Sequence, residues 1–148
     1  MAWTLTGNEA DAEDLAHDTM AAALTSLGRF RAKAALSTWL TSILINRHRS
    51  RRRSFAIRSR LQPRVEAARP KPGDDPAEAR EQRERLRAAL ARLEPDEREL
   101  LALSYDRGLD SSEIGRLLDR PAGTIRSQLH DVREKLKTML TEAQPHEA

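Results

Sequence analysis

The sequence contains no cysteine among its 148 residues, which excludes disulfide frameworks, thiol nucleophiles and cysteine-based zinc or iron–sulfur sites. Its longest apolar run, residues 40–45, is interrupted by Thr41 and Ser42 and is far shorter than the roughly 20 apolar residues that cross a bilayer. The N-terminus has no basic stretch ahead of its few apolar residues, so it does not resemble a signal peptide. We therefore expect a soluble protein of a reducing cytoplasm, without membrane insertion.

Motifs for catalysis are also missing. The histidines are dispersed along the chain, and no glycine-rich phosphate loop or nucleophile–base pattern is recognisable. We predict that the protein is not an enzyme, has no catalytic residue and needs no metal or cofactor. The four histidines are His17, His48, His130 and His146.

Acidic residues are absent from one long segment of the chain. Residues 29–60 contain ten Lys and Arg and no Asp or Glu, whereas residues 1–28 contain five acids and no Lys or Arg. A merely solvated surface usually mixes both signs to avoid self-repulsion, so this segregation indicates two partners of opposite charge. The acids are Glu9, Asp11, Glu13, Asp14 and Asp18; the bases are Arg29, Arg31, Lys33, Arg47, Arg49, Arg51, Arg52, Arg53, Arg58 and Arg60.

Aromatic residues make up only 3% of the chain, and no stretch shows the sustained alternation that is typical of strands, so the fold class is predicted to be all-α. Four of the seven prolines fall within residues 63–76, which is the composition of a linker. We predict two small helical domains, residues 1–60 and 77–140, joined by a Pro-rich linker at 61–76 and followed by a polar tail at 141–148.

Helix ends in the first half are predicted from capping residues. Asn8 is a suitable N-cap for an amphipathic helix that Gly28 would terminate. Ser37 is the predicted N-cap of the second helix. Asp75 is the predicted N-cap of the third, with Pro76 at its first helical position.

The end of the second domain has the pattern of two helices joined by a short turn. Asp110 and Glu113 form a capping box. The helix that they open cannot continue past Pro121, and a last helix begins near Ala122. Gly115 is small enough for two backbones to cross closely at its position. The pattern predicts a helix-turn-helix, although a helical hairpin that only packs has the same pattern.

The last helix has a basic stripe beside its apolar one. Basic side chains on the outside of a second helix suit phosphates and guanine edges, and the first turn of such a helix favours a phosphate. The first turn holds Gly123 and Thr124, and the stripe consists of Arg126, His130, Arg133 and Lys137 at steps of four, three and four.

Short motifs in both predicted domains match one known family in the same order. The first domain has LTGN at 5–8, DAEDL at 11–15, FR at 30–31, STWL at 37–40 and NR at 46–47; the second has LEPDER at 93–98, YDRGL at 105–109, SEIG at 112–115 and GTIRSQLH at 123–130. These stretches resemble regions two and four of the extracytoplasmic-function (ECF) sigma factors of bacterial RNA polymerase.

The resemblance implies a non-catalytic subunit that confers promoter recognition and DNA opening on core RNA polymerase, with core polymerase, promoter DNA and an anti-sigma factor as partners. It implies polymerase-binding residues Asp11, Glu13, Asp14, Leu15 and Asp18. For the minus-ten element it implies Phe30, Arg31, Lys33, Ser37, Thr38, Asn46, Arg47, Arg49, Arg52 and Arg53. For the minus-thirty-five element it implies Gly123, Thr124, Arg126, Ser127, Gln128, His130 and Arg133. Trp39 could face unstacked bases, but its apolar neighbours favour a core position.

Two alternatives remain open on the sequence. A stand-alone helix-turn-helix repressor would leave the segregated charges of the first domain unexplained. A sigma mimic would bind an anti-sigma protein and no DNA; Gln128 and Asp131, which stand at usually basic positions, favour it, whereas the basic segment 29–60 opposes it. Relative to the family, Met1 falls inside the first region-two helix, so we expect either the loss of that helix or a misassigned start.

Overall fold

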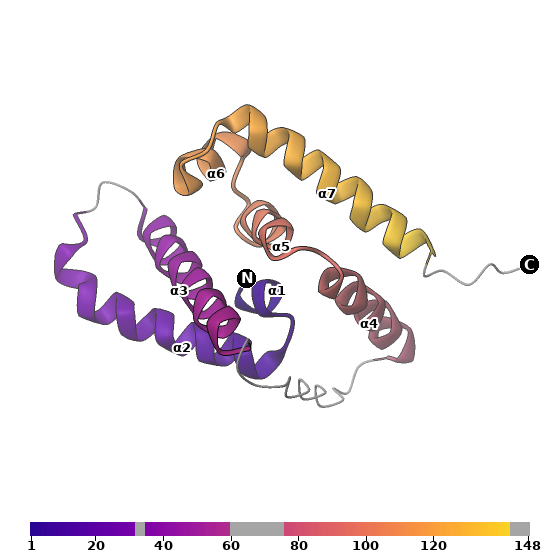
Figure 1. Cartoon of the computed structure of the whole chain (residues 1–148), viewed down its shortest axis with the longest axis horizontal. Helices are drawn as coiled ribbons and strands as arrows, with labels where there is room; N and C mark the ends of the chain where they lie inside the picture. Colours follow the sequence, from indigo (N-terminus) through magenta and orange to yellow (C-terminus); the bar gives the residue numbers. More distant parts are fainter. Residues whose placement is uncertain (32–34, 60–75, 143–148) are drawn as a thin grey trace, which may run out of the picture. The chain divides into compact units, whose positions relative to one another are not determined.

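The chain forms two compact helical units in the computed structural model (Figure 1), which describes residues 1–31, 35–59 and 76–142. All regular elements in these ranges are helical, which confirms the predicted all-α class. Within the same ranges, no helix is both long and apolar enough to cross a membrane.

The N-terminal unit is built on two helices that pack side by side, α2 (Glu9–Ser26) and α3 (Leu36–Ser59), with the 3-10 turn η1 (Leu27–Arg29) after α2. Leu15 and Ile45 are buried between them at 0% and 2% exposure. The buried hydroxyl of Thr19 donates to the Leu15 carbonyl at 2.7 Å, so this polar group is buried with its hydrogen bond made.

The helix ends of this unit agree only in part with the predictions. Asn8 is the N-cap of α2, since its side chain accepts a hydrogen bond from the Asp11 N–H at 2.8 Å. α2 ends at Ser26 with Leu27 as its C-cap, so the helix stops just before Gly28, as predicted, but Gly28 lies inside η1 and lacks the positive φ that is typical of a helix-terminating glycine. The prediction for Ser37 is wrong, because α3 already begins at Leu36.

The C-terminal unit contains α4 (Ala77–Ala91), α5 (Pro95–Leu101), the π-helical segment η2 (Ala102–Asp106), α6 (Ser111–Leu118) and α7 (Ala122–Glu142). Its core includes a cluster of Leu90, Leu93, Leu101 and Val132, to which α4, α5 and α7 contribute. The apolar stripe predicted on the last helix is the buried side of α7, where Ile125, Leu129 and Val132 are at most 3% exposed.

The predicted boundaries of α4 and α7 need two adjustments. Pro76 is the N-cap residue of α4 and not its first helical residue; Asp75, the predicted N-cap, lies outside the described residues. The predicted linker at 61–76 lies outside them too, except for Pro76. At the other end, α7 continues through Glu142 into the predicted tail.

A short helix at the start of the chain, α1 (Ala2–Thr6), was not predicted. Trp3 packs against the core cluster of the C-terminal unit, and the Arg87 guanidinium lies 5.4 Å from the centre of its ring. The Thr4 hydroxyl donates to an Asp106 carboxylate oxygen at 2.6 Å. Trp3–Gly7 therefore groups with the C-terminal unit in this structure; the domain limits 1–60 and 77–140 stay predictions.

Candidate functional site

The predicted polymerase-binding acids occupy two sides of α2. Asp11, Asp14 and Asp18 recur at steps of three and four, which places them on one side of the helix, while Glu13 lies on another. All four are exposed. Leu15 is fully buried in its unit, so it does not share their surface.

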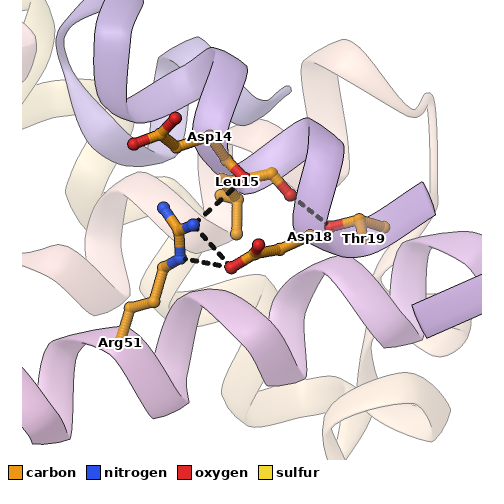
Figure 2. Close-up of polar contacts among 5 residues, drawn as sticks. All are labelled: Asp14, Leu15, Asp18, Thr19 and Arg51. Atoms are coloured by element: carbon orange, nitrogen blue, oxygen red, sulfur yellow. Dashed lines mark hydrogen bonds and ion pairs between the residues drawn. The ribbon is translucent and has the colours of Figure 1, made fainter. Parts of the chain in front are cut away.

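One of these acids is tied to the basic helix of the same unit (Figure 2). Arg51 of α3 donates from Nε and Nη2 to Oδ2 of Asp18 at 3.0 and 2.5 Å, and from Nη2 to the Asp14 backbone carbonyl at 3.0 Å. Among the described residues, the Asp14 carboxylate has no ion-pair partner, whereas Asp18 has one. The Asp14 carboxylate is thus available to a partner, whereas the Asp18 carboxylate joins α2 to α3.

The predicted minus-ten residues gather mainly on α3. Asn46, Arg49 and Arg53 recur at steps of three and four and so share one side of this helix, with Asn46 and Arg53 exposed. Arg47 is also exposed, but on a different side, and Arg52 is half-buried.

The remaining predicted minus-ten residues lie before α3 or in its first turn. The rings of Phe30 and Trp39 are half-buried and pack together with centroids 5.1 Å apart and planes tilted by 43°. Phe30 thus lies against Trp39 and is not free on the surface. Arg31 and Ser37 are exposed, Thr38 is half-buried, and Lys33 is outside the described residues.

The predicted helix-turn-helix is present as α6 and α7. Oδ1 of Asp110 accepts hydrogen bonds from the N–H groups of Ser112 and Glu113, and Oε2 of Glu113 accepts one from the Asp110 N–H, each at 2.8 Å. The predicted capping box is therefore confirmed. Gly115 is the point of close approach, because a Cβ there would lie 2.6 Å from the Arg120 carbonyl oxygen.

The exposed surface of α7 has two flanks beside its buried stripe. We call the first the basic flank: Arg126, His130, Arg133 and Lys137, all exposed. The second, the polar flank, contains Thr124, Gln128 and Asp131, of which Gln128 is half-buried. Gly123 and Ser127, the other two predicted contacts, are exposed between the two flanks.

Contacts within the unit distinguish the cations of the basic flank. The Arg133 guanidinium lies 5.4 Å from the centre of the Tyr105 ring and donates to the Ser104 hydroxyl at 3.4 Å. Arg126, in the second turn of α7, has no ion pair or hydrogen bond to another side chain in the part of the chain that the structure describes. Arg126 is therefore available to a ligand, whereas Arg133 is already engaged.

Three arrangements at these sites escaped prediction from sequence. They are the Arg51–Asp18 pair, the Arg133–Tyr105 stacking and a hydrogen bond from Arg120 to Gln128 at 2.7 Å. The partners are separated by 33, 28 and eight residues along the chain. No group of His, Asp and Glu able to hold a metal occurs among the described residues.

Each half of the chain matches the model of a known protein family. Residues 1–56 match the model of Sigma-70 region 2, and residues 83–136 match that of Sigma-70, region 4. The chain is 31% identical over 139 residues to the ECF RNA polymerase sigma factor EcfG of Rhodopseudomonas palustris, covering 93% of this chain and 75% of the relative. It is 34% identical over 142 residues to the RNA polymerase sigma factor CarQ of Myxococcus xanthus, covering 91% and 78%. It spans 56% of SigE of Mycolicibacterium smegmatis, with 33% identity over 146 residues and 95% of this chain covered.

Solved structures show the same fold. The sigma factor RpoE of Bartonella quintana, crystallised in complex with the anti-sigma factor NepR, matches 97% of this chain and 89% of its own with a TM-score of 0.80 and 24% identity. CnrH, in complex with the cytosolic domain of CnrY, matches 97% and 79% with a TM-score of 0.68 and 22% identity. With both regions matched in order and relatives above 30% identity along most of their length, the chain belongs to the ECF group of RNA polymerase sigma factors.

Proposed function

We propose that the two units divide the contacts of a sigma factor between them, with α2 binding core polymerase, α3 binding the minus-ten element and α7 binding the minus-thirty-five element. A sigma factor confers promoter recognition and DNA opening on core RNA polymerase, and this is the function of the chain. The assignment to particular residues rests on one observation above all: the helix-turn-helix presents an exposed basic flank on its second helix. Such a flank suits the phosphates and guanine edges of the major groove.

The N-terminal unit supplies the other two contacts. The carboxylate of Asp14, exposed and without an ion-pair partner among the described residues, is suited to a basic polymerase surface. The exposed cations on α3 are suited to promoter phosphates, and Asn46 on the same side offers both donor and acceptor groups to a base.

Partners and location follow from the family. The two solved relatives were determined as complexes, RpoE with the anti-sigma factor NepR and CnrH with the cytosolic domain of CnrY. We infer that this chain also binds an anti-sigma factor, acts in the cytoplasm with RNA polymerase and performs no chemical step itself.

Transcription from a candidate promoter with purified core polymerase, with and without this protein, tests the function. We expect promoter-specific initiation only when both are present. Tight, sequence-specific binding of duplex DNA by the protein alone, with no effect of polymerase, would instead indicate a repressor. Binding to an anti-sigma protein with no transcription would indicate a sigma mimic.

Arg126→Ala and Lys137→Ala should have different effects on promoter selection. Arg126 lies near the start of α7, where a recognition helix reaches base edges, and one bidentate Arg–guanine contact contributes about 1–3 kcal/mol of discrimination. We expect Arg126→Ala to relax the preference at one or two positions of the minus-thirty-five element. Lys137 lies three turns further along the basic flank, so Lys137→Ala should weaken binding to all sequences alike and reduce the salt slope by about 1.

A panel of minus-thirty-five variants, assayed with holoenzyme at several salt concentrations, measures both effects. A uniform loss of affinity in Arg126→Ala would show that Arg126 contacts only the DNA backbone.

A further inference from the structure

The turn between α6 and α7 makes a side-chain contact with the polar flank of α7. Nη2 of Arg120, in the turn, donates to Oε1 of Gln128 at 2.7 Å, in a partly buried hydrogen bond. Gln128 lies one turn beyond Thr124 on this flank. The contact therefore joins the loop of the helix-turn-helix to a residue of its second helix.

The backbone of Arg120 is held on both sides. Its N–H donates to the Gly115 carbonyl at 2.8 Å, and its own carbonyl lies so close to Gly115 that only glycine fits there. Asp119, the residue before Arg120, has the left-handed conformation with φ 55°. Pro121, the residue after Arg120, restricts the ψ angle of Arg120. The Arg120 guanidinium therefore extends toward α7 from a backbone whose conformation is constrained.

The direction of this hydrogen bond determines which amide group of Gln128 stays available. A guanidinium has donors and no acceptor, so the amide must turn its oxygen toward Arg120 and its NH2 group away. An unconstrained glutamine can present its oxygen and its nitrogen together, which is how it recognises adenine. The bond from Arg120 occupies one of the two lone pairs of the Gln128 oxygen and holds that oxygen on the Arg120 side, so the amide presents its NH2 donors on the opposite side.

We propose that Arg120 is a positioning residue that fixes Gln128 as a hydrogen-bond donor to the minus-thirty-five element, and so favours guanine or thymine over adenine and cytosine at one position. Guanine N7 and O6 and thymine O4 are the acceptors that such a donor meets in the major groove. Asp131, exposed on the same flank, disfavours a close phosphate there, which leaves a base edge as the partner of Gln128. The inference rests on the proposed function of α7 in binding this element.

The test uses holoenzyme and a promoter panel that carries each of the four bases at every minus-thirty-five position. Gln128→Ala identifies the position at which preference is lost. We expect Arg120→Ala to reduce the preference at that same position, by about tenfold for one lost base contact, and the double variant to show no further loss there. Arg120→Lys, which keeps a donor, should retain part of the preference.

Two further variants test whether Arg120 acts by positioning Gln128 and not through its charge or through the stability of the unit. Arg116→Ala removes an exposed cation from α6 and should leave the base preference at the Gln128 position unchanged. Gln128→Glu keeps a partner for Arg120 but presents only acceptors, so its preference should move toward cytosine, whose N4 is a donor. Thermal unfolding of each variant shows whether the unit stays folded; if Arg120→Ala unfolds, Arg120→Lys and Gln128→Glu decide the question.

An Arg120→Ala variant that stays folded and weakens transcription equally from all promoters would overturn the inference, as would a Gln128→Glu variant with unchanged base preference. Wild-type holoenzyme without any preference within the minus-thirty-five element would overturn the proposed function of α7 as well.

Discussion

Replacing Gly115 with alanine is expected to lower the free energy of unfolding of the C-terminal unit by about 2 kcal/mol, within the range for overpacked sites, and to abolish transcription that depends on the minus-thirty-five element. Alanine would gain up to about 1 kcal/mol from its higher helix propensity. The added Cβ, however, would lie 2.6 Å from the Arg120 carbonyl oxygen, a backbone atom that cannot move away by rotating a side chain. The clash therefore outweighs the propensity, and the turn must open.

Gly123→Ala is the matched control for this variant. Gly123 is also helical, in the first turn of α7, but a Cβ there would have no atom within 4 Å. We expect Gly123→Ala to stabilise the unit by roughly 0.5–1 kcal/mol. Urea denaturation followed by circular dichroism measures both changes; equal midpoints for Gly115→Ala and wild type would show that α6 and the turn are further apart than in this structure.

The helix-turn-helix could be predicted from sequence because its signals are local. The capping box of Asp110 and Glu113 and the stop at Pro121 each act within a few residues of chain. The close approach of the turn to Gly115 could be inferred from the small size of glycine. What the sequence could not indicate is which backbone atom approaches it, since the Arg120 carbonyl is positioned by the left-handed residue Asp119.

Predictions were wrong or missing where contacts distant in sequence determine the outcome. Trp3 lies near the residues of the first domain in sequence, but its ring packs on core residues that lie between 87 and 129 positions later. The pairing of Asp18 with Arg51 depends on how α2 packs against α3. Ser37 failed as a helix-start signal, since α3 already begins at Leu36, because propensity only weakly determines where a helix begins.

Asp14→Lys and Asp18→Ala should affect different properties of the protein. Asp14→Lys reverses a charge that has no ion-pair partner among the described residues, so we expect core polymerase affinity to fall about tenfold at low salt through like-charge repulsion, with little change in stability. Asp18→Ala removes the partner of Arg51. It should lower the stability of the N-terminal unit by about 1 kcal/mol, the upper end for an exposed pair, with a smaller loss of polymerase affinity.

Arg51→Ala completes the comparison, because it removes the same ion pair while leaving every acid of α2 in place. It should lower stability at least as much as Asp18→Ala, because the hydrogen bond to the Asp14 carbonyl is lost as well, but it should keep or raise the polymerase affinity, since the Asp18 carboxylate is then released. Titration of fluorescently labelled protein with core polymerase at low and moderate salt measures the affinities, and the Asp14→Lys defect should shrink as salt rises because screening weakens exposed charge contacts. If Asp18→Ala and Arg51→Ala both lost polymerase affinity equally while Asp14→Lys kept it, the packing of α2 against α3, and not the acidic side of α2, would carry the interaction.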